Sequence, residues 1–190
     1  MIQPFFYTLS GMNKLVLSII LASMSCIVLA GPFAVSAEED INVEIDVMLA
    51  RAEYFFKSLS KGEYDAAWDS LSDNSRKTII DDVYKTYQKM GGQIQRAAIE
   101  QDFNNSGTIF HNYWNSFEQN FDILMILDDS RWQTGMMEQH KAEINITYKG
   151  SKNPLKLKMV KENDLWKVGL VETFWQGKSM DVLQSILKFI

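Results

Sequence analysis

The fold is decided between Met136 and Trp175, where one run reads Ala142-Glu143-Ile144-Asn145-Ile146-Thr147-Tyr148. Its even positions are apolar and its odd positions are polar, the period of two that is typical of a half-buried β-strand. The run from Leu155 to Met159 alternates in the same way, and a longer run continues from Leu165 to Trp175 with the apolar residues Trp166, Val168, Leu170 and Phe174 on one face. Polar turns separate the runs. The pattern predicts an antiparallel meander with one dry face.

The region before this meander has the spacing of amphipathic helices, which we expect to cover the dry face. Apolar residues recur at steps of three and four from Ile41 to Leu59. Shorter helices are predicted over residues 63–71, 76–90 and 93–103, and a last one over Ser179–Ile190. Residues 104–127 fit either helix or strand, because their aromatic residues have helical spacing while the later part fits both periods.

The predicted fold class is therefore α+β. N-terminal helices pack on a curved antiparallel sheet of three to four strands, and a short C-terminal helix follows. The turn Ser72-Asp73-Asn74-Ser75 is placed to cap the helix that begins after it, because serine and asparagine side chains accept hydrogen bonds from the first free N–H groups of a helix.

Residues 1–37 have the organisation of a secretory signal peptide. Lys14 precedes an apolar stretch without charge, and Val35-Ser36-Ala37 supplies the small residues that signal peptidase requires. An uncleaved membrane anchor is the alternative, because the apolar run is nearly long enough to span a bilayer. Pro32 and the small-residue exit favour cleavage near Ala37. We expect a periplasmic or secreted single domain, residues 38–190, that meets the membrane only through the uncleaved signal.

The composition limits the chemistry of this domain. Cys26, the single cysteine, lies inside the signal, which excludes disulfides, zinc–thiolate sites and cysteine nucleophiles from the exported part. The net charge of −5 argues against nucleic acid as a partner. Two histidines without regularly spaced carboxylates predict no metal site, and no pattern indicates a cofactor. A small apolar ligand and a homodimer stay open as partners.

Two motifs resemble a known family. The first is Ser60-Lys61-Gly62-Glu63-Tyr64-Asp65-Ala66-Ala67-Trp68 after a long helix, and the second is Leu165-Trp166-Lys167-Val168 in the meander. Together they resemble exported bacterial members of the nuclear transport factor 2-like superfamily, the cystatin-like α+β cone, over residues 41–72 and 136–175. The resemblance implies a sheet wrapped round helices, with an open end that often holds a small apolar ligand and in some members an active site.

A second, looser likeness concerns the end of the chain. Periplasmic phospholipid-carrier proteins look similar in outline, because they also place a segment like Gly177-Lys178-Ser179-Met180 between the sheet and a closing helix. This likeness implies a lipid-like ligand.

Glu138 and His140 are the first candidates for catalysis. On the predicted strand they share the face of Ala142, roughly 6.6 Å apart, so a carboxylate could assist an imidazole in acid–base chemistry. The alternative is that the strand frays there and both side chains face water. Asp128, beside Asp129, is a second candidate base.

The resemblance to the steroid-isomerase branch of the superfamily implies such a base together with an oxyanion donor. Tyr113 or Tyr148 could serve as that donor, with Arg131 close to the acidic pair in sequence. An acidic turn before a strand is the structural alternative.

Aromatic residues are the candidates for lining a ligand cavity, against the ordinary alternative of core packing. The predicted ligand contacts are Tyr113, Trp114, Phe117, Phe121, Tyr148 and Trp166. The favoured function is an exported, non-catalytic binding module that holds a small apolar or lipid-like ligand, or a partner protein, in the cone. The alternative is a small acid–base enzyme of the isomerase or hydratase kind in the same cavity.

Overall fold

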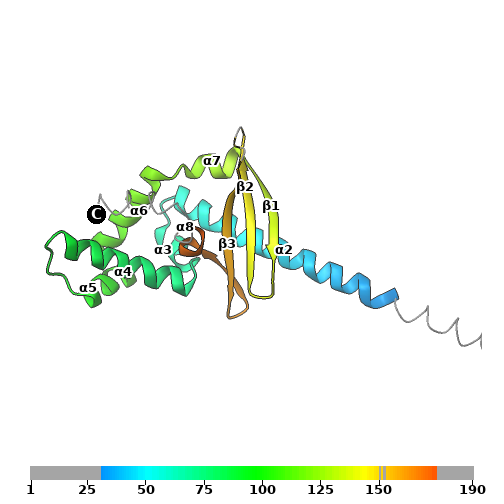
Figure 1. Cartoon of the computed structure of the whole chain (residues 1–190), viewed down its shortest axis with the longest axis horizontal. Helices are drawn as coiled ribbons and strands as arrows, with labels where there is room; N and C mark the ends of the chain where they lie inside the picture. The colour runs from blue at the N-terminus through cyan, green and yellow to red at the C-terminus, as the bar shows by residue number, and fades with distance from the viewer. Residues whose placement is uncertain (1–30, 150, 152, 175–190) are drawn as a thin grey trace, which may run out of the picture. The chain divides into compact units, whose positions relative to one another are not determined.

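The computed structural model describes residues 31–149, 151 and 153–174 (Figure 1). The chain divides into two compact units, Met1–Glu44 and Ile45–Ile190. In the first unit, residues 31–44 are helical and belong to α2 (Gly31–Ser60), which therefore starts before the predicted Ile41. Most of the predicted signal peptide, the Gly177–Met180 segment and the predicted helix Ser179–Ile190 lie outside the described residues.

The second unit begins with a series of helices. After α2 come α3 (Tyr64–Asp69), α4 (Asp73–Lys89), α5 (Arg96–Asn104), α6 (Thr108–Asn120) and α7 (Ile123–Asp128). The open question at residues 104–127 is settled as helix. Phe121 separates α6 from α7 with an extended backbone (φ −136°, ψ 111°), and the Asp122 carboxylate caps α7 by accepting a hydrogen bond from the Met125 N–H at 2.9 Å. No helix in the described part of the chain is both long and apolar enough to cross a membrane.

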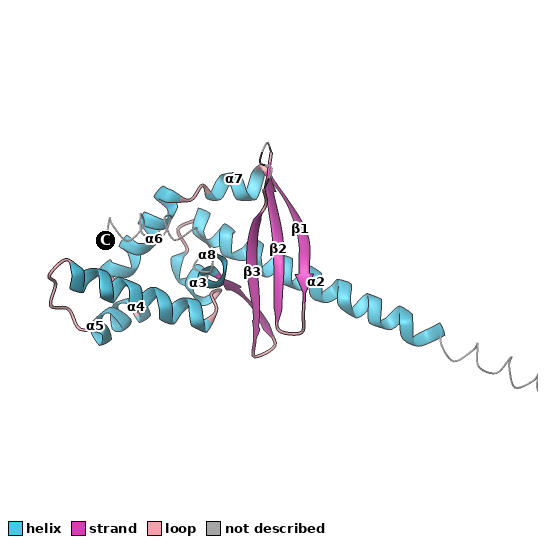
Figure 2. Cartoon of the chain, in the orientation of Figure 1, coloured by secondary structure: helices cyan, strands magenta, loops and turns pink. Residues whose placement is uncertain are grey.

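The predicted antiparallel meander is confirmed. Its strands are β1 (Ser130–Met137), β2 (Lys141–Tyr148), β3 (Leu155–Glu162) and β4 (Leu165–Gly169), and they lie in the order β1-β2-β3-β4 (Figure 2). A short helix, α8 (Leu170–Phe174), follows the last strand. The α+β class, with helices first and then a sheet and a short helix, is as predicted.

Two boundaries in the sheet were predicted wrongly. The expected strand through Glu138 and His140 does not exist, because residues 138–140 form the hairpin turn between β1 and β2. The strand expected from Leu165 to Trp175 ends at Gly169, where the chain turns into α8. That turn buries Leu170 and Phe174 in the core and places the α8 N-terminus beside α4.

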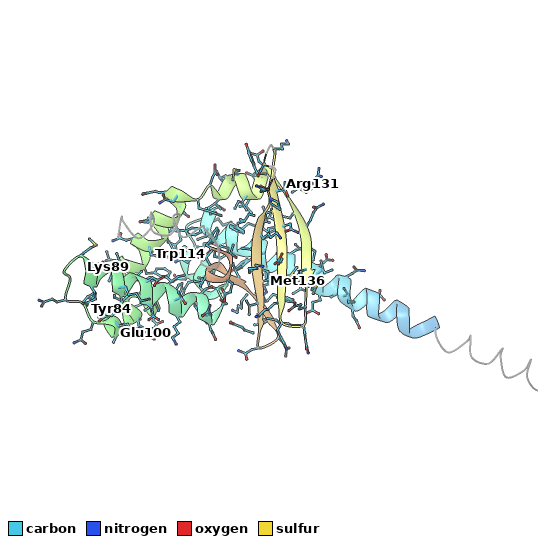
Figure 3. The ribbon with its side chains drawn as sticks, viewed as in Figure 1. Tyr84, Lys89, Glu100, Trp114, Arg131 and Met136 are labelled. Carbon is cyan, nitrogen blue, oxygen red and sulfur yellow. The ribbon has the colours of Figure 1, made fainter. Side chains whose placement is uncertain are left out.

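The core lies between the dry face of the sheet and the helices. Three even positions of β2 are buried as predicted, Ala142, Ile144 and Ile146, each at most 3% exposed, whereas Tyr148 at the end of the strand is 42% exposed. Rings from α2 and α6 fill the helical side, where Trp114 contacts Phe55 and Phe117 at centroid distances of 6.2 and 5.6 Å. Figure 3 shows Trp114 among the helices, away from the surface.

The connector between α3 and α4 extends the sheet beyond β4. Leu71 forms a parallel bridge with Val168. The Ser72 N–H donates to the Val168 carbonyl at 2.9 Å, and the Val168 N–H donates to the Ser70 carbonyl at 2.8 Å. The helical series is therefore joined to the last strand by main-chain hydrogen bonds.

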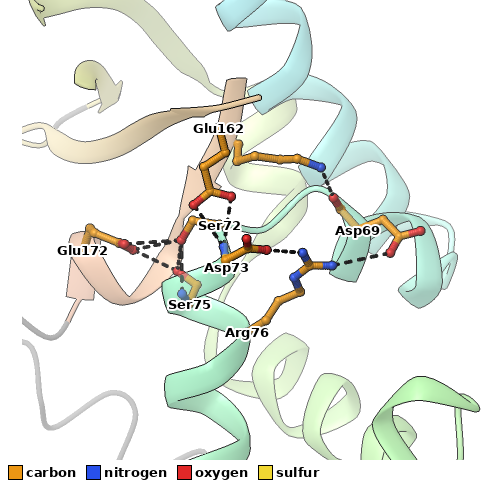
Figure 4. A network of polar contacts seen from close by, with 8 residues as sticks. Asp69, Ser72, Asp73, Ser75, Arg76, Glu162 and Glu172 are labelled. Carbon is orange, nitrogen blue, oxygen red and sulfur yellow. Dashed lines mark hydrogen bonds and ion pairs between the residues drawn. The ribbon is translucent and has the colours of Figure 1, made fainter. Parts of the chain in front are cut away.

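A buried polar joint completes this connection (Figure 4). The predicted cap is confirmed, because the Ser72 hydroxyl accepts from the Ser75 N–H at the start of α4. The Ser75 hydroxyl donates to the Glu172 carboxylate at 2.8 Å and accepts from the Val171 N–H at 3.0 Å. Each of the two helices, α4 and α8, thus satisfies polar groups at the N-terminus of the other.

Replacing Ser75 should show how much this joint stabilises the fold. Ser75→Ala leaves the buried Val171 N–H without its acceptor, so we expect the free energy of unfolding to fall by about 1–3 kcal/mol. Urea denaturation measures the change. The matched control is Ser60→Ala, because that exposed hydroxyl donates only to the Lys57 carbonyl. Equal losses in the two variants would contradict the role of the joint.

The outer face of the sheet carries a cross-strand ion pair. Glu143 and Lys158 lie directly opposite each other on β2 and β3, and their side chains form a charged hydrogen bond. This bond holds the pKa of Glu143 below its ordinary value of 4.5. Because the folded-state pKa is the lower one, the pair stabilises the fold above the ordinary carboxyl pKa. That contribution is lost as the pH falls through the folded-state pKa.

Glu143→Gln should therefore lower stability at pH 7, and the loss should shrink as the pH falls through the lowered folded-state pKa of Glu143, where the wild-type carboxylate takes up a proton. Urea denaturation at pH 7, 5 and 3 measures the difference. Glu138→Gln is the control, since Glu138 is exposed in the hairpin turn of the same sheet. A loss for Glu143→Gln that does not change with pH would contradict this assignment.

Candidate functional site

A small apolar hollow lies between α7 and the dry face of the sheet. Its volume is about 260 Å³. Ile126 of α7 and Ile146 of β2 are both buried to 3% exposure, and Phe121, Met125 and Leu155 are half-buried around them. The polar members of the lining are Ser130, Tyr148, Ser151 and Asn153. An apolar cavity with a few polar groups is the usual form of a small-molecule site.

Local hydrogen bonds hold α7 beside the sheet and so define one wall of the hollow. The Ser130 hydroxyl donates to the Met125 carbonyl, and the Trp132 indole N–H donates to the Ile126 carbonyl, both at 3.0 Å. Both acceptors are carbonyls in the middle of a six-residue helix, and the Met125 carbonyl also accepts from the Asp129 N–H that caps the helix, at 3.2 Å. The segment Asp129-Ser130-Arg131-Trp132, which leads into β1, is therefore held to α7 by the hydrogen bonds of Ser130 and Trp132.

Phe121 connects the hollow to the aromatic core. Its ring lies 5.2 Å from Phe117, 5.5 Å from Phe174 and 6.3 Å from Phe56, measured between centroids. With neighbours from α2, α6 and α8, this ring can shift little. The wall that it forms is fixed by core packing.

A second, polar hollow adjoins the first around the end of the sheet. Its volume is about 480 Å³, and it shares Ser130, Tyr148 and Ser151 with the apolar hollow. Its charged lining consists of Asp128, Asp129, Arg131 and Lys149, all of them exposed. Arg131 marks this end of the sheet in Figure 3, and Met136 lies toward the opposite end.

The structure separates the predicted catalytic residues. Asp128 precedes β1, whereas Glu138 and His140 follow its last residue, so about 23 Å of extended strand lies between them at roughly 3.3 Å per residue. All three side chains are exposed. Asp128, Arg131 and Tyr148 do line one hollow, but that hollow is the open polar one.

Tyr113 does not serve as an oxyanion donor in this geometry. It is 1% exposed, and burial raises the pKa of its hydroxyl, with the charge of Asp82 as a smaller contribution. Its hydroxyl has no hydrogen-bond partner among the described residues. A neutral phenol enclosed by the core cannot reach a substrate.

The predicted ligand contacts fall into two groups. Phe121 and Tyr148 line the apolar hollow. Tyr113, Trp114 and Phe117 are at most 1% exposed and pack against other rings, and Trp166 is 3% exposed on the dry face of the sheet. For Tyr113, Trp114 and Phe117 the ordinary alternative, core packing, describes their surroundings, whereas Trp166 borders a different hollow, at the edge of β4.

Sequence patterns alone did not identify most of the residues that line the apolar hollow. Ile146 was predicted to face inward but not to border a cavity, and Leu155 belongs to the alternating run of β3. Met125 and Ile126 lie within residues 104–127, where the sequence pattern fits helix and strand equally well. The signal that could have found them is the cap at Asp122, which starts a new helix immediately after the aromatic series.

Another titratable cluster joins α3 to α6. The Tyr64 hydroxyl contacts Asn115 Oδ1 and Glu118 Oε2, both at 2.9 Å. Burial, followed by the hydrogen bond to Glu118, raises the pKa of Tyr64 to about 12. His111 packs against the same ring at 5.7 Å. No group of three or more His, Cys, Asp or Glu residues suited to a metal occurs in the described part of the chain.

Comparison of the chain with protein-family models, with curated proteins and with solved structures finds no match.

Proposed function

We propose that this protein is an exported, non-catalytic binding module that holds a small apolar or lipid-like molecule in the hollow between α7 and the sheet. The observation that carries the proposal is the lining of that hollow, in which Phe121, Met125, Ile126, Ile146 and Leu155 surround a volume of about 260 Å³. That volume suits a short acyl chain or a molecule of similar width better than a large cofactor.

The neighbouring polar hollow supports an amphipathic ligand. It begins at the shared residues Ser130, Tyr148 and Ser151 and carries two acidic and two basic side chains. A ligand with an apolar part and a polar head would place each part in a matching environment.

The separation of Asp128 from Glu138 and His140, together with the exposure of all three side chains, supports a binding role over acid–base catalysis. General acid–base chemistry requires groups within hydrogen-bond reach of one substrate position. The two ends of an eight-residue strand do not meet that requirement.

Export and family membership belong to the same proposal. The charge-free stretch before Val35-Ser36-Ala37 supports export with cleavage near Ala37. The order of elements, with helices followed by an antiparallel meander, supports the resemblance to the nuclear transport factor 2-like cone. A hollow at one end of the sheet is also what that resemblance implies.

Native mass spectrometry of protein purified from its own host is the direct experiment. We expect a bound mass that organic solvent releases and that belongs to an apolar or amphipathic compound. Protein that carries no such compound and also fails to bind an apolar probe would overturn the proposal.

The hollow itself can be tested with N-phenyl-1-naphthylamine, a neutral fluorescent probe. Met125→Gln places an amide on the apolar wall, so we expect probe affinity to fall about 10-fold, since an unpaired polar group costs roughly 1–3 kcal/mol. Fluorescence titration measures the affinity.

Two variants serve as controls for this titration. Leu124→Gln changes the adjacent α7 residue, which is 62% exposed and outside the hollow, and should bind the probe as the wild type does. His140→Ala should also leave binding unchanged, because His140 lies in the remote hairpin turn. Reduced binding by folded His140→Ala protein would reinstate that histidine as a site residue.

A further inference from the structure

The free edge of β4 is covered along only part of its length. Val168 directs both its N–H and its C=O away from β3, to Ser70 and Ser72 of the connector. Main-chain groups along a strand point to alternate sides, so Trp166, two residues earlier, directs its N–H and C=O to the same free edge. Among the described residues, no main-chain group is hydrogen-bonded to the Trp166 N–H or C=O at this edge.

A hollow of about 380 Å³ opens at this uncovered portion. It lies among α2, α3 and β4, and its lining includes Arg51, Tyr54, Ala66, Ser70, Leu165 and Trp166. Tyr54 and Leu165 are each 47% exposed, so the hollow is reached from solvent past two large side chains.

Trp166 brings polar groups without partners to this place. The residue is 3% exposed, and its indole N–H has no hydrogen-bond partner among the described residues. Buried donors without acceptors are rare in folded proteins because each loses its hydrogen bond to water. The main-chain N–H and C=O of Trp166 at the β4 edge would gain partners from a guest strand, which would lie next to this indole.

The charge in the hollow selects the kind of guest. Lys167 donates to the main-chain carbonyl of Asp69 at 2.6 Å, and the Asp69 carboxylate lies 4.0 Å from Arg76. Arg51, in contrast, has no ion-pair partner within the described residues. A guanidinium with free donors fits a carboxylate, which it can bind through two parallel hydrogen bonds.

We propose that this hollow binds the C-terminal end of an extended peptide, which adds a short strand to β4 at Trp166. The peptide main chain accepts from the Trp166 N–H and donates to the Trp166 C=O, and Arg51 binds the terminal carboxylate. Leu165 and Tyr54 contact the peptide side chains. This site is separate from the apolar hollow beside α7 and does not depend on its ligand.

The test uses ¹⁵N-labelled protein and the peptide acetyl-Thr-Val-Thr-Val with a free carboxylate. We expect the backbone and indole N–H signals of Trp166 to shift and saturate during titration. The same peptide with a C-terminal amide should bind about 10-fold more weakly, because it lacks the charge that Arg51 recognises. A peptide with proline at its second position should also bind more weakly, since proline lacks a main-chain donor.

Arg51→Gln should reduce binding of the free-acid peptide to that of the amide, with an unchanged melting temperature because Arg51 is exposed. Lys57→Gln is the matched control, since it removes an exposed cation from the same helix outside the hollow. Trp166 signals that stay fixed at millimolar peptide would overturn the proposal. So would equal binding of acid and amide, or signals that move with protein concentration alone, which would indicate a second copy of the chain.

Discussion

The structure depends on burying one face of a four-stranded sheet. The even positions of β2 and the matching positions of β3 and β4 are apolar, and a meander of this size is stable only when such a face is removed from water. The rings of α2 and α6 provide the cover. Because α7 has only six residues, it covers one end of the face incompletely, and the apolar hollow remains there. Both the stability and the proposed site follow from the same helix–sheet contact.

Much of this architecture could be predicted from local patterns. The alternation in Ala142–Tyr148, the helical spacing in Ile41–Leu59 and the cap at Ser72 each reflect one short-range requirement, and each appears in the structure. The class α+β followed from their order. Residues 104–127 could not be assigned, because a short apolar run fits helix and strand equally well until its caps and neighbours are known.

The errors arose where tertiary contacts override the local pattern. Leu170 and Phe174 continue the apolar spacing of β4, but the hydrogen bond from Val171 to Ser75 starts a helix instead. The turn at residues 138–140 was missed because Met136 and Met137 lengthen the apparent run toward β1. Glu138 and His140 consequently seemed to face a cavity.

The candidate site was harder to predict than the fold for a related reason. Core residues and cavity residues have the same composition, so Trp114 and Phe121 look alike in sequence although only Phe121 borders the hollow. Whether such a ring borders a hollow depends on the length of α7 and on the connection from α7 to β1. Those quantities are set by packing between segments that are far apart in the chain.

The joint between α4 and α8 has a consequence for the order of folding. The hairpins of the meander close over short turns, whereas the Ser75–Val171 bond connects residues 96 positions apart. Closing so large a loop costs more chain entropy than closing a hairpin and is slow when contacts are distant in sequence. The hairpins of the meander are thus expected to form early, and the hydrogen bonds between the N-termini of α4 and α8 are expected to form late in folding.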